Sequence, residues 1–181
     1  MSLLKEKYGI GIIVCRMQVP YLTASHIALI KTVFDRHQRI IIFLGTTNKP
    51  MDEKNPFPFE FRKQMLMQTI KTLGSTGELT IVPLPDCEDN PLWVKFLDNM
   101  ISSFLAHDED AYLYGGRESF IPFYEKDNGK FECRELEPGD YDSGTELRQL
   151  VSKDQPKYSY DAACAILWAM RQLKNKNNEK L

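Results

Sequence analysis

The sequence predicts an α/β fold in a single domain, built on a doubly wound, five-stranded parallel sheet. Short apolar runs rich in β-branched residues recur along the chain, as in strands that are buried on both faces. Segments with apolar residues three and four positions apart separate these runs, as in amphipathic helices. The 181 residues suit one domain with a sizeable core, because domains usually span roughly 100–200 residues.

Five apolar runs are expected as strands, and they cover residues 8–15, 39–47, 78–86, 111–116 and 130–136. Helices are expected from their apolar periodicity at 25–37, 59–73, 90–107, 143–152 and 160–176. Ser25 is a candidate N-cap of the first helix, and Gly74 is expected to end the second. Loops are expected at 48–57 and at 117–129, where there is room for a short helix. The expected domain is 1–181, with a helical C-terminal part over 143–176.

Composition and charge exclude several classes of function. The net charge of -2 leaves no basic excess to neutralise a nucleic-acid backbone, so we expect no nucleic-acid partner. We expect no membrane span, because no apolar run approaches the ~18 residues that one needs. The four cysteines form no C-x-x-C pair and do not cluster with the histidines, which argues against a metal site and fits a reducing cytoplasm. His37 and His107 are expected at the surface or at helix ends.

The loop after the first strand is a candidate ligand site, because open parallel sheets bind ligands at the carboxyl ends of their strands. It offers the fixed charge of Arg16, the hydroxyl groups of Thr23 and Ser25, and His26 at the start of a helix. The alternative interpretation is a surface arginine, a capped helix and a histidine that binds backbone. The loops after the second and fourth strands are also well placed for a ligand.

A second candidate lies at the start of the expected helix 143–152. Ser143 and Thr145 bring hydroxyl groups beside the free N–H groups of its first turn, where phosphate binds well, and Arg148 follows. The alternative is a capping box formed by Ser143 and Glu146, which occurs in many helices that bind nothing.

The two segments together resemble the paired motifs [HT]-x-G-H and I-S-x-T-x-x-R of the nucleotidylyl transferase superfamily. The first motif reads Thr23-Ala24-Ser25-His26 here, and the second ends at Arg148 after Asp142 in the usually apolar position. A narrower resemblance, over roughly residues 8–155, is to the nicotinamide mononucleotide adenylyltransferases of the Nudix-fused type. It is carried by "IIVCRMQVPYLTASHIALI", "KNPFPFEFRKQML" and "DNPLWVKFL". We expect no Nudix domain in this chain.

The resemblance implies a Rossmann-like HUP fold and transfer of AMP from ATP to nicotinamide mononucleotide, without a covalent intermediate. Mg²⁺ would be held mainly by substrate phosphates. The implied catalytic residues are His26, Thr23, Arg148 and Arg16. The implied nucleotide-binding residues are Gln18, Ser25, Gly115, Gly116, Arg117, Ser143 and Thr145. The implied acceptor-binding residues are Trp93, which would stack on nicotinamide, Asn55 and Arg62.

Departures from the family pattern leave alternatives open. Ser25 stands at the motif glycine, where a Cβ could crowd the nucleotide, so a nucleotide-binding module with impaired catalysis is one alternative. An adenylyl- or cytidylyltransferase for another phosphorylated acceptor is a second. Trp93 could instead be a core residue, Arg62 could pair with Glu60 or with another surface carboxylate, and the glycines at 115–116 could form a plain turn. Association into a homo-oligomer is left open.

Overall fold

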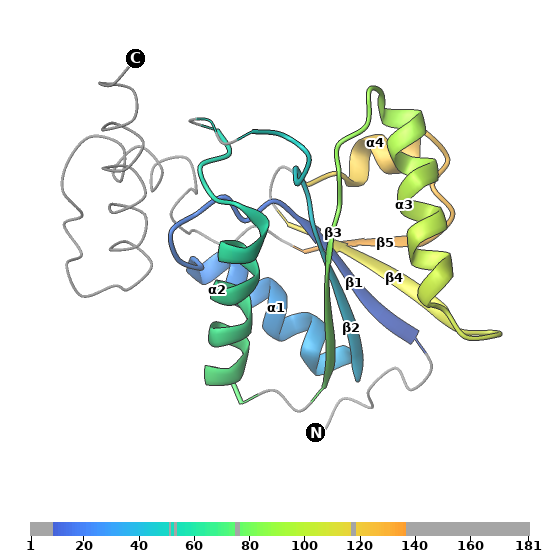
Figure 1. Cartoon of the computed structure of the whole chain (residues 1–181). Coiled ribbons are helices and arrows are strands. Elements are labelled where there is room, and N and C mark those ends of the chain that lie inside the picture. Colours follow the sequence, from blue (N-terminus) through green and yellow to red (C-terminus); the bar gives the residue numbers. More distant parts are fainter. Residues whose placement is uncertain (1–8, 51, 53, 75–76, 117–118, 137–181) are drawn as a thin grey trace, which may run out of the picture.

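A computed structural model of the chain describes residues 9–50, 52, 54–74, 77–116 and 119–136. These residues form one sheet with the strand order β3-β2-β1-β4-β5, in which every neighbouring pair is parallel. The predicted five-stranded parallel sheet is therefore confirmed (Figure 1). The order runs outward from β1 in one direction to β3 and in the other to β5, so the strand order reverses beside β1. Open sheets of this kind bind ligands at such a reversal.

The strands are β1 (Gly9–Cys15), β2 (Arg39–Leu44), β3 (Glu78–Pro83), β4 (Asp110–Gly115) and β5 (Glu132–Glu135). The helices are α1 (Ala24–Arg36), α2 (Phe59–Thr72), α3 (Asn90–Phe104) and α4 (Ile121–Lys126). Each expected element before residue 137 is present, and most are a few residues shorter than expected. The expected helices at 143–152 and 160–176 lie outside the described residues, so the predicted C-terminal part stays a prediction.

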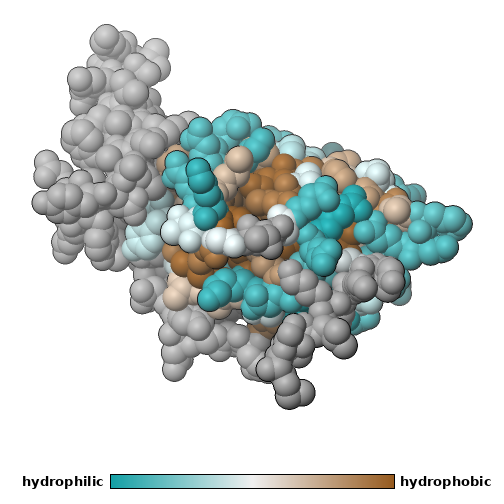
Figure 2. Space-filling view, turned by 90° about the horizontal axis from the view of Figure 1, so that it is seen from below, coloured by the Kyte–Doolittle hydropathy of each residue, from teal (hydrophilic) through white to brown (hydrophobic). Residues whose placement is uncertain are grey.

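Helices cover both faces of the sheet, with α1 and α2 on one face and α3 and α4 on the other (Figure 1). The side chains of each strand alternate between the two cores, as a period of two residues requires. In β2, Ile40 and Ile42 join the core under α1 and α2, whereas Ile41 and Phe43 join the core under α3. From below, the described residues show apolar surface in the middle and hydrophilic surface around it (Figure 2). No described helix has the length and apolar character needed to span a membrane.

The ends of two helices test the capping predictions. Helix α1 is capped by Thr23, two residues before the expected Ser25, because the Thr23 side chain accepts from the backbone N–H of His26. Ser25 is therefore the second residue of α1, and the prediction of Ser25 as N-cap is wrong. Gly74 follows the end of α2 with φ of +67°, as predicted, because glycine adopts this left-handed conformation readily.

His37 lies at a helix end, which is one of its two expected positions, but it is buried and not at the surface. It is the C-cap of α1 and has no exposed surface. Its Nδ1 lies 3.0 Å from the carbonyl oxygen of Gly9, and its Nε2 lies 2.8 Å from the hydroxyl of Tyr114. Partners from two strands compensate for the loss of water, so His37 joins α1 to the sheet.

Candidate active site

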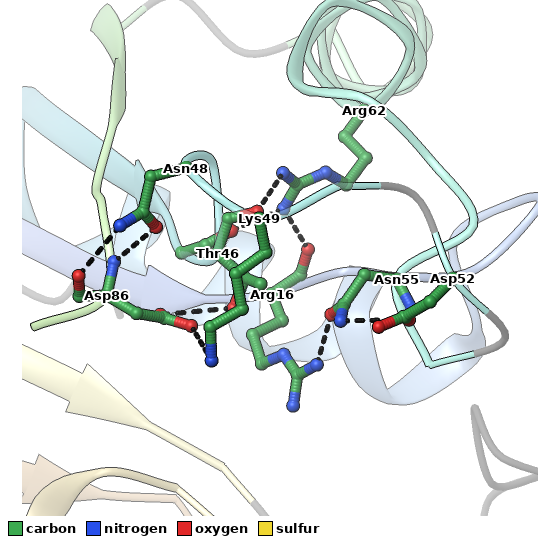
Figure 3. Close-up of polar contacts among 9 residues, drawn as sticks. Arg16, Thr46, Asn48, Lys49, Asp52, Asn55, Arg62 and Asp86 are labelled. Carbon is green, nitrogen blue, oxygen red and sulfur yellow. Dashed lines mark hydrogen bonds and ion pairs between the residues drawn. The ribbon is translucent and has the colours of Figure 1, made fainter. Parts of the chain in front are cut away.

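Loops that follow three neighbouring strands meet at the carboxyl edge of the sheet. Arg16 follows β1, Thr46 follows β2, and Asp86 follows β3 (Figure 3). The segment before α2 and the first turns of α2 add Asn55 and Arg62 to the same region. Arg16, from the predicted site after β1, is therefore part of a wider polar cluster.

Thr23 and His26 bind one another at the start of α1. The backbone N–H of Thr23 donates to Nδ1 of His26 at 3.2 Å, and the Thr23 hydroxyl lies 2.7 Å from the same nitrogen. The backbone N–H of His26 donates to the Thr23 hydroxyl oxygen at 3.4 Å. Because a backbone N–H can only donate, Nδ1 acts as an acceptor and the ring proton lies on Nε2.

His26 is neutral at physiological pH. Burial lowers its pKa to about 4, because the charged form of the ring loses hydration there. The ring therefore presents Nε2–H as a neutral hydrogen-bond donor. Among the described residues, none accepts from the backbone N–H groups of Ala24 and Ser25, which open α1. These N–H groups, the helix dipole and the Nε2–H group can bind an anion together.

Arg16 has an exposed side chain whose guanidinium is oriented by Asn55. One terminal nitrogen of Arg16 donates to Oδ1 of the buried Asn55 (Figure 3). Asn55 is held in turn by Asp52, whose Oδ1 accepts from the Asn55 backbone N–H at 2.6 Å and from its Nδ2 at 3.1 Å. These hydrogen bonds lower the pKa of the Asp52 carboxyl. The other donors of Arg16 are not used by this contact, and five are available to a guanidinium.

Gln18 and Phe57 join the loop after β1 to the segment before α2. Gln18 Nε2 donates to the Phe57 carbonyl oxygen at 3.3 Å, and the Phe57 N–H donates to Gln18 Oε1 at 3.0 Å. Gln18 is buried, so this reciprocal pair satisfies an amide that water cannot reach. The described contacts give Gln18 a scaffold role, and its nucleotide contact stays a prediction.

Arg62 is buried, with 1% of its surface exposed. Its guanidinium donates to the backbone carbonyl oxygens of Arg16 and Gly45 at 2.6 and 2.8 Å. A surface ion pair with Glu60 is therefore wrong as an account of this arginine. An acceptor contact, the other prediction for Arg62, is not tested by these distances.

Trp93 lies in the first turn of α3, partly buried against the core. Its ring centroid is 5.3 Å from that of Phe123 and 6.0 Å from that of Phe120, both in inclined geometries. Such contacts hold an indole ring in one orientation while part of it stays accessible. Both the core and the stacking interpretations of Trp93 are compatible with this position.

Gly115 and Gly116 differ in what a side chain would meet. A Cβ at Gly115 would lie 2.6 Å from the Cβ of Ser119 and 2.8 Å from Cδ1 of Ile121, so the close approach of the segment before α4 requires glycine there. A Cβ at Gly116 would meet no described atom within 4 Å. Packing thus explains Gly115, whereas Gly116 is left for the predicted nucleotide contact.

Four of the predicted site residues lie outside the described residues: Arg117, Ser143, Thr145 and Arg148. Hydrogen bonds join Arg16, Asn55 and Arg62, and Gln18 binds Phe57, two residues after Asn55. Thr23 caps α1, and Ser25 and His26 lie in its first turn. Trp93 lies near the start of α3, Gly115 is the last residue of β4, and Gly116 follows it.

A cluster around Asp86 was not predicted from the sequence. Its Oδ1 accepts from the Thr46 hydroxyl at 3.2 Å, and its Oδ2 lies 2.9 Å from Nζ of Lys49. Asn48 and the Asp86 backbone also exchange two hydrogen bonds, of 2.8 and 2.9 Å (Figure 3). The polar stretch "GTTNKP" after β2 is the sequence signal of this cluster, and its partner Asp86 ends the apolar run of β3.

Comparison with known proteins shows a consistent set of relatives. The chain is 26% identical to the nicotinamide-nucleotide adenylyltransferase of Pyrococcus abyssi over 146 residues, covering 81% of this chain and 74% of the relative. It is 29% identical to the enzyme of the same name from Caldivirga maquilingensis over 147 residues, covering 79% and 76%. The chain is a homologue of the nicotinamide-nucleotide adenylyltransferases. A scan against protein-family models finds no match.

Solved structures show the fold of this nicotinamide-nucleotide adenylyltransferase homologue. A bifunctional NMN adenylyltransferase/ADP ribose pyrophosphatase from Francisella tularensis superposes with a TM-score of 0.68 at 20% identity. That match covers 95% of this chain and 56% of the other, so the chain spans little more than half of the bifunctional protein. A NadR protein in complex with NAD and AMP-PNP superposes with a TM-score of 0.54 at 13% identity, covering 81% of this chain and 43% of the other. The predicted Rossmann-like fold is confirmed.

Proposed function

We propose that the chain transfers AMP from ATP to nicotinamide mononucleotide, with NAD and pyrophosphate as products. A phosphate oxygen of the acceptor attacks the α-phosphorus of ATP in line, and the bond from that phosphorus to the bridging α–β oxygen breaks. The names of the archaeal relatives support this reaction. The observation that carries it is the Thr23–His26 pair at the start of α1, beside the point where strand order reverses.

In this proposal, His26 binds an oxygen of the transferring phosphoryl group through Nε2–H. A neutral donor suits the role, because it stabilises negative charge that develops on the phosphoryl oxygens and needs no proton transfer. The free N–H groups at the start of α1 bind the same anion. Arg16 adds a fixed positive charge, which Asn55 holds near the exit of β1. Catalysis then rests on positioning and electrostatics, as in phosphoryl transfer generally.

The proposal assigns the β- and γ-phosphates of ATP to the second motif. Arg148, Ser143 and Thr145 would bind these phosphates and the departing pyrophosphate, and Arg117 would be a further phosphate ligand. These assignments rest on the motif, because the four residues lie outside the described part of the chain. Gly116 would lie against the adenosine.

Mg²⁺ is part of the proposal as a charge-neutralising ion on the phosphates. Within the described ranges, no three histidine, cysteine, aspartate or glutamate side chains are grouped to hold a metal ion. The proposed ion would be held largely by phosphate oxygens and water, which is the usual mode for Mg²⁺ at nucleotides. A solved structure of the Francisella bifunctional protein is described as complexed with AMP and a manganese ion.

Trp93 is the proposed recognition residue for the acceptor ring. Its position in the first turn of α3, held by two phenylalanine rings, supports a stacking role against a flat heterocycle. We also propose a cytoplasmic location, which the free thiols of Cys15, Cys87 and Cys133 support.

The proposed function is tested by NAD formation from ATP, Mg²⁺ and nicotinamide mononucleotide. Nicotinate mononucleotide and a panel of other phosphorylated acceptors are assayed in parallel, with pyrophosphate as the common product. The exposed His107 supplies a matched control, so His26→Ala is compared with His107→Ala. Preference for a different acceptor would identify the chain as an adenylyltransferase for that acceptor. ATP binding without pyrophosphate release would identify a non-catalytic module.

A further inference from the structure

The Arg62 guanidinium joins the ends of two neighbouring strands. One of its terminal nitrogens binds the carbonyl oxygens of Arg16, just after β1, and Gly45, just after β2, and the other lies 3.5 Å from the Thr46 carbonyl oxygen. Its Nε is buried and has no partner among the described residues. The ion pairs of the described residues do not include Arg62. A buried cation thus rests on carbonyl dipoles, and burial lowers its pKa.

The carbonyl groups that Arg62 binds flank two residues with unusual backbone conformation. Met17, with φ of 44°, follows Arg16, and Thr46, with φ of 56°, follows Gly45. Left-handed backbone is unfavourable for residues other than glycine, especially for β-branched threonine. Such conformations persist where the surroundings hold them, and they cluster at functional sites. Here the surroundings include the three carbonyl contacts of Arg62.

We propose that Arg62 is a positioning residue for the adenylyl transfer, an inference that rests on the proposed function. It holds the two strand-exit turns together and so fixes where the Arg16 side chain and the Thr46–Asp86 pair stand toward the substrates. It acts through the backbone of these turns and does not touch substrate. The fixed fork of an arginine suits this task, because its nitrogens reach three carbonyl groups from one plane.

The alternative is that Arg62 only stabilises the fold. Arg39 offers a matched control for this, because it lies at the opposite end of the sheet, at the start of β2. Its guanidinium also binds a backbone carbonyl, that of Phe104 at 2.8 Å, and pairs with Glu109 at 2.8 Å. Arg62→Lys and Arg39→Lys are therefore compared in the full chain, by melting temperature and by kcat and KM for both substrates.

We expect Arg62→Lys to lower kcat about 10- to 100-fold, since small displacements of catalytic groups have effects of this size. KM for ATP and for the acceptor is expected to change less than about threefold, because uniform binding is retained. Arg39→Lys should leave kcat within about twofold of the wild-type value, with a melting temperature similar to that of Arg62→Lys. Equal kcat values for the two variants would overturn the proposal.

A second variant separates positioning from folding. Thr46→Asn lowers the conformational penalty at residue 46, because asparagine adopts left-handed backbone more readily than threonine, and its side-chain amide can still donate to Asp86. In the Arg62→Lys background this substitution should raise kcat at least about five times more than it does in the wild-type chain. The two effects are coupled because residues 46 and 62 are in contact. Absence of this rescue would contradict the proposal, whatever the loss of stability.

Hydrogen exchange distinguishes failure of this inference from failure of the proposed function. The Gly45 N–H donates to the Cys15 carbonyl oxygen at 2.8 Å and so joins the ends of β1 and β2. Amide exchange at Gly45 should be faster in Arg62→Lys and unchanged in Arg39→Lys, and this readout needs no turnover. Unchanged exchange at Gly45 would overturn the positioning role. If the wild-type chain is inactive but amide exchange is faster in Arg62→Lys, the proposed reaction is refuted and the link between the two turns is retained.

Discussion

Thr23 and His26 bind each other from opposite ends of one helical turn, with the hydroxyl of the first 2.7 Å from Nδ1 of the second. This contact caps α1 and at the same time orients the imidazole ring. One pair of side chains thereby joins the start of a helix to the group that we propose binds the reacting phosphate. Stability and activity are therefore expected to respond together when Thr23 is changed.

Thr23→Ala should lower both activity and stability. The helix loses its cap, which costs about 1 kcal/mol in unfolding free energy. His26 also loses the hydroxyl that orients it, and kcat is expected to fall about 10- to 100-fold, the usual size of a misplacement effect. Urea unfolding and steady-state kinetics measure the two effects. Thr23→Ser retains the hydroxyl and should keep most of both, and a fully active Thr23→Ala would contradict the assigned role.

The pKa of His26 predicts how activity depends on pH. With a folded-state pKa of about 4, the ring stays neutral from pH 9 down to about pH 5, so the contribution of His26 to kcat should be flat over that range. Below pH 5 the ring becomes protonated and kcat should fall. A decrease in kcat centred near pH 6.5 that disappears in His26→Gln would show that the ring titrates as it does in water.

The lowered pKa of His26 also predicts how the free energy of unfolding depends on pH. Because the folded-state pKa lies below the ordinary value of 6.5, the unfolded chain binds more protons at this residue between pH 6.5 and 4. The stabilising contribution of neutral His26 is thus present above pH 6.5 and is lost as pH falls toward 4. Unfolding free energies of the wild type and His26→Gln should converge over this window. A constant difference between them would contradict the shifted pKa.

Trp93→Ala tests the proposed contact with the acceptor ring. Loss of a stacking surface is expected to raise KM for nicotinamide mononucleotide about tenfold, as losing 1–3 kcal/mol of stacking does for other bases, with KM for ATP unchanged. Trp93→Phe should restore much of the affinity. The neighbouring Leu92 has 51% of its surface exposed, so Leu92→Ala is a suitable control. A Trp93→Ala chain with unaltered acceptor affinity would leave Trp93 as a core residue.

Gly115→Ala and Gly116→Ala should have different effects. The added methyl group at residue 115 meets Ser119 and Ile121 at less than 3 Å and should destabilise the fold by about 1–3 kcal/mol, as overpacking does. The methyl group at residue 116 has space, so the melting temperature should stay the same while KM for ATP rises if adenosine lies against it. Equal destabilisation by the two changes would show that the surroundings of residue 116 are as crowded as those of residue 115.

Local sequence signals predicted most of the sheet and the place of the site. In continuous apolar runs such as "RIIIFL" in β2, all the side chains are removed from water only when both faces of the strand are buried. This pattern predicts a parallel sheet, with ligands at one edge. Thr23 and Ser25 both have a hydroxyl group that can cap a helix, so capping preference alone does not decide between them. The choice of Thr23 depends on its return contact from His26, and a histidine in that position departs from the usual capping box.

Contacts between distant residues could not be predicted in this way. Arg62 binds carbonyl groups that lie 16 to 46 positions away, and His37 meets the hydroxyl of Tyr114 at a separation of 77 residues. Both side chains look like exposed polar groups on helices until the sheet brings their partners to them. The cluster at Asp86 has the same origin, because two loops of neighbouring strands provide its parts.

Transfer of radiolabel from [α-³²P]ATP tests the central claim most directly. The wild type and His107→Ala should incorporate the label into NAD in the presence of nicotinamide mononucleotide, one NAD for each pyrophosphate released, with no label on the protein. His26→Ala should lower the rate at least about 100-fold, the usual effect of losing one donor to a transition-state oxyanion. Label that stays on bound ATP, or an unchanged rate in His26→Ala, would contradict the proposed transfer and the role of His26 in it.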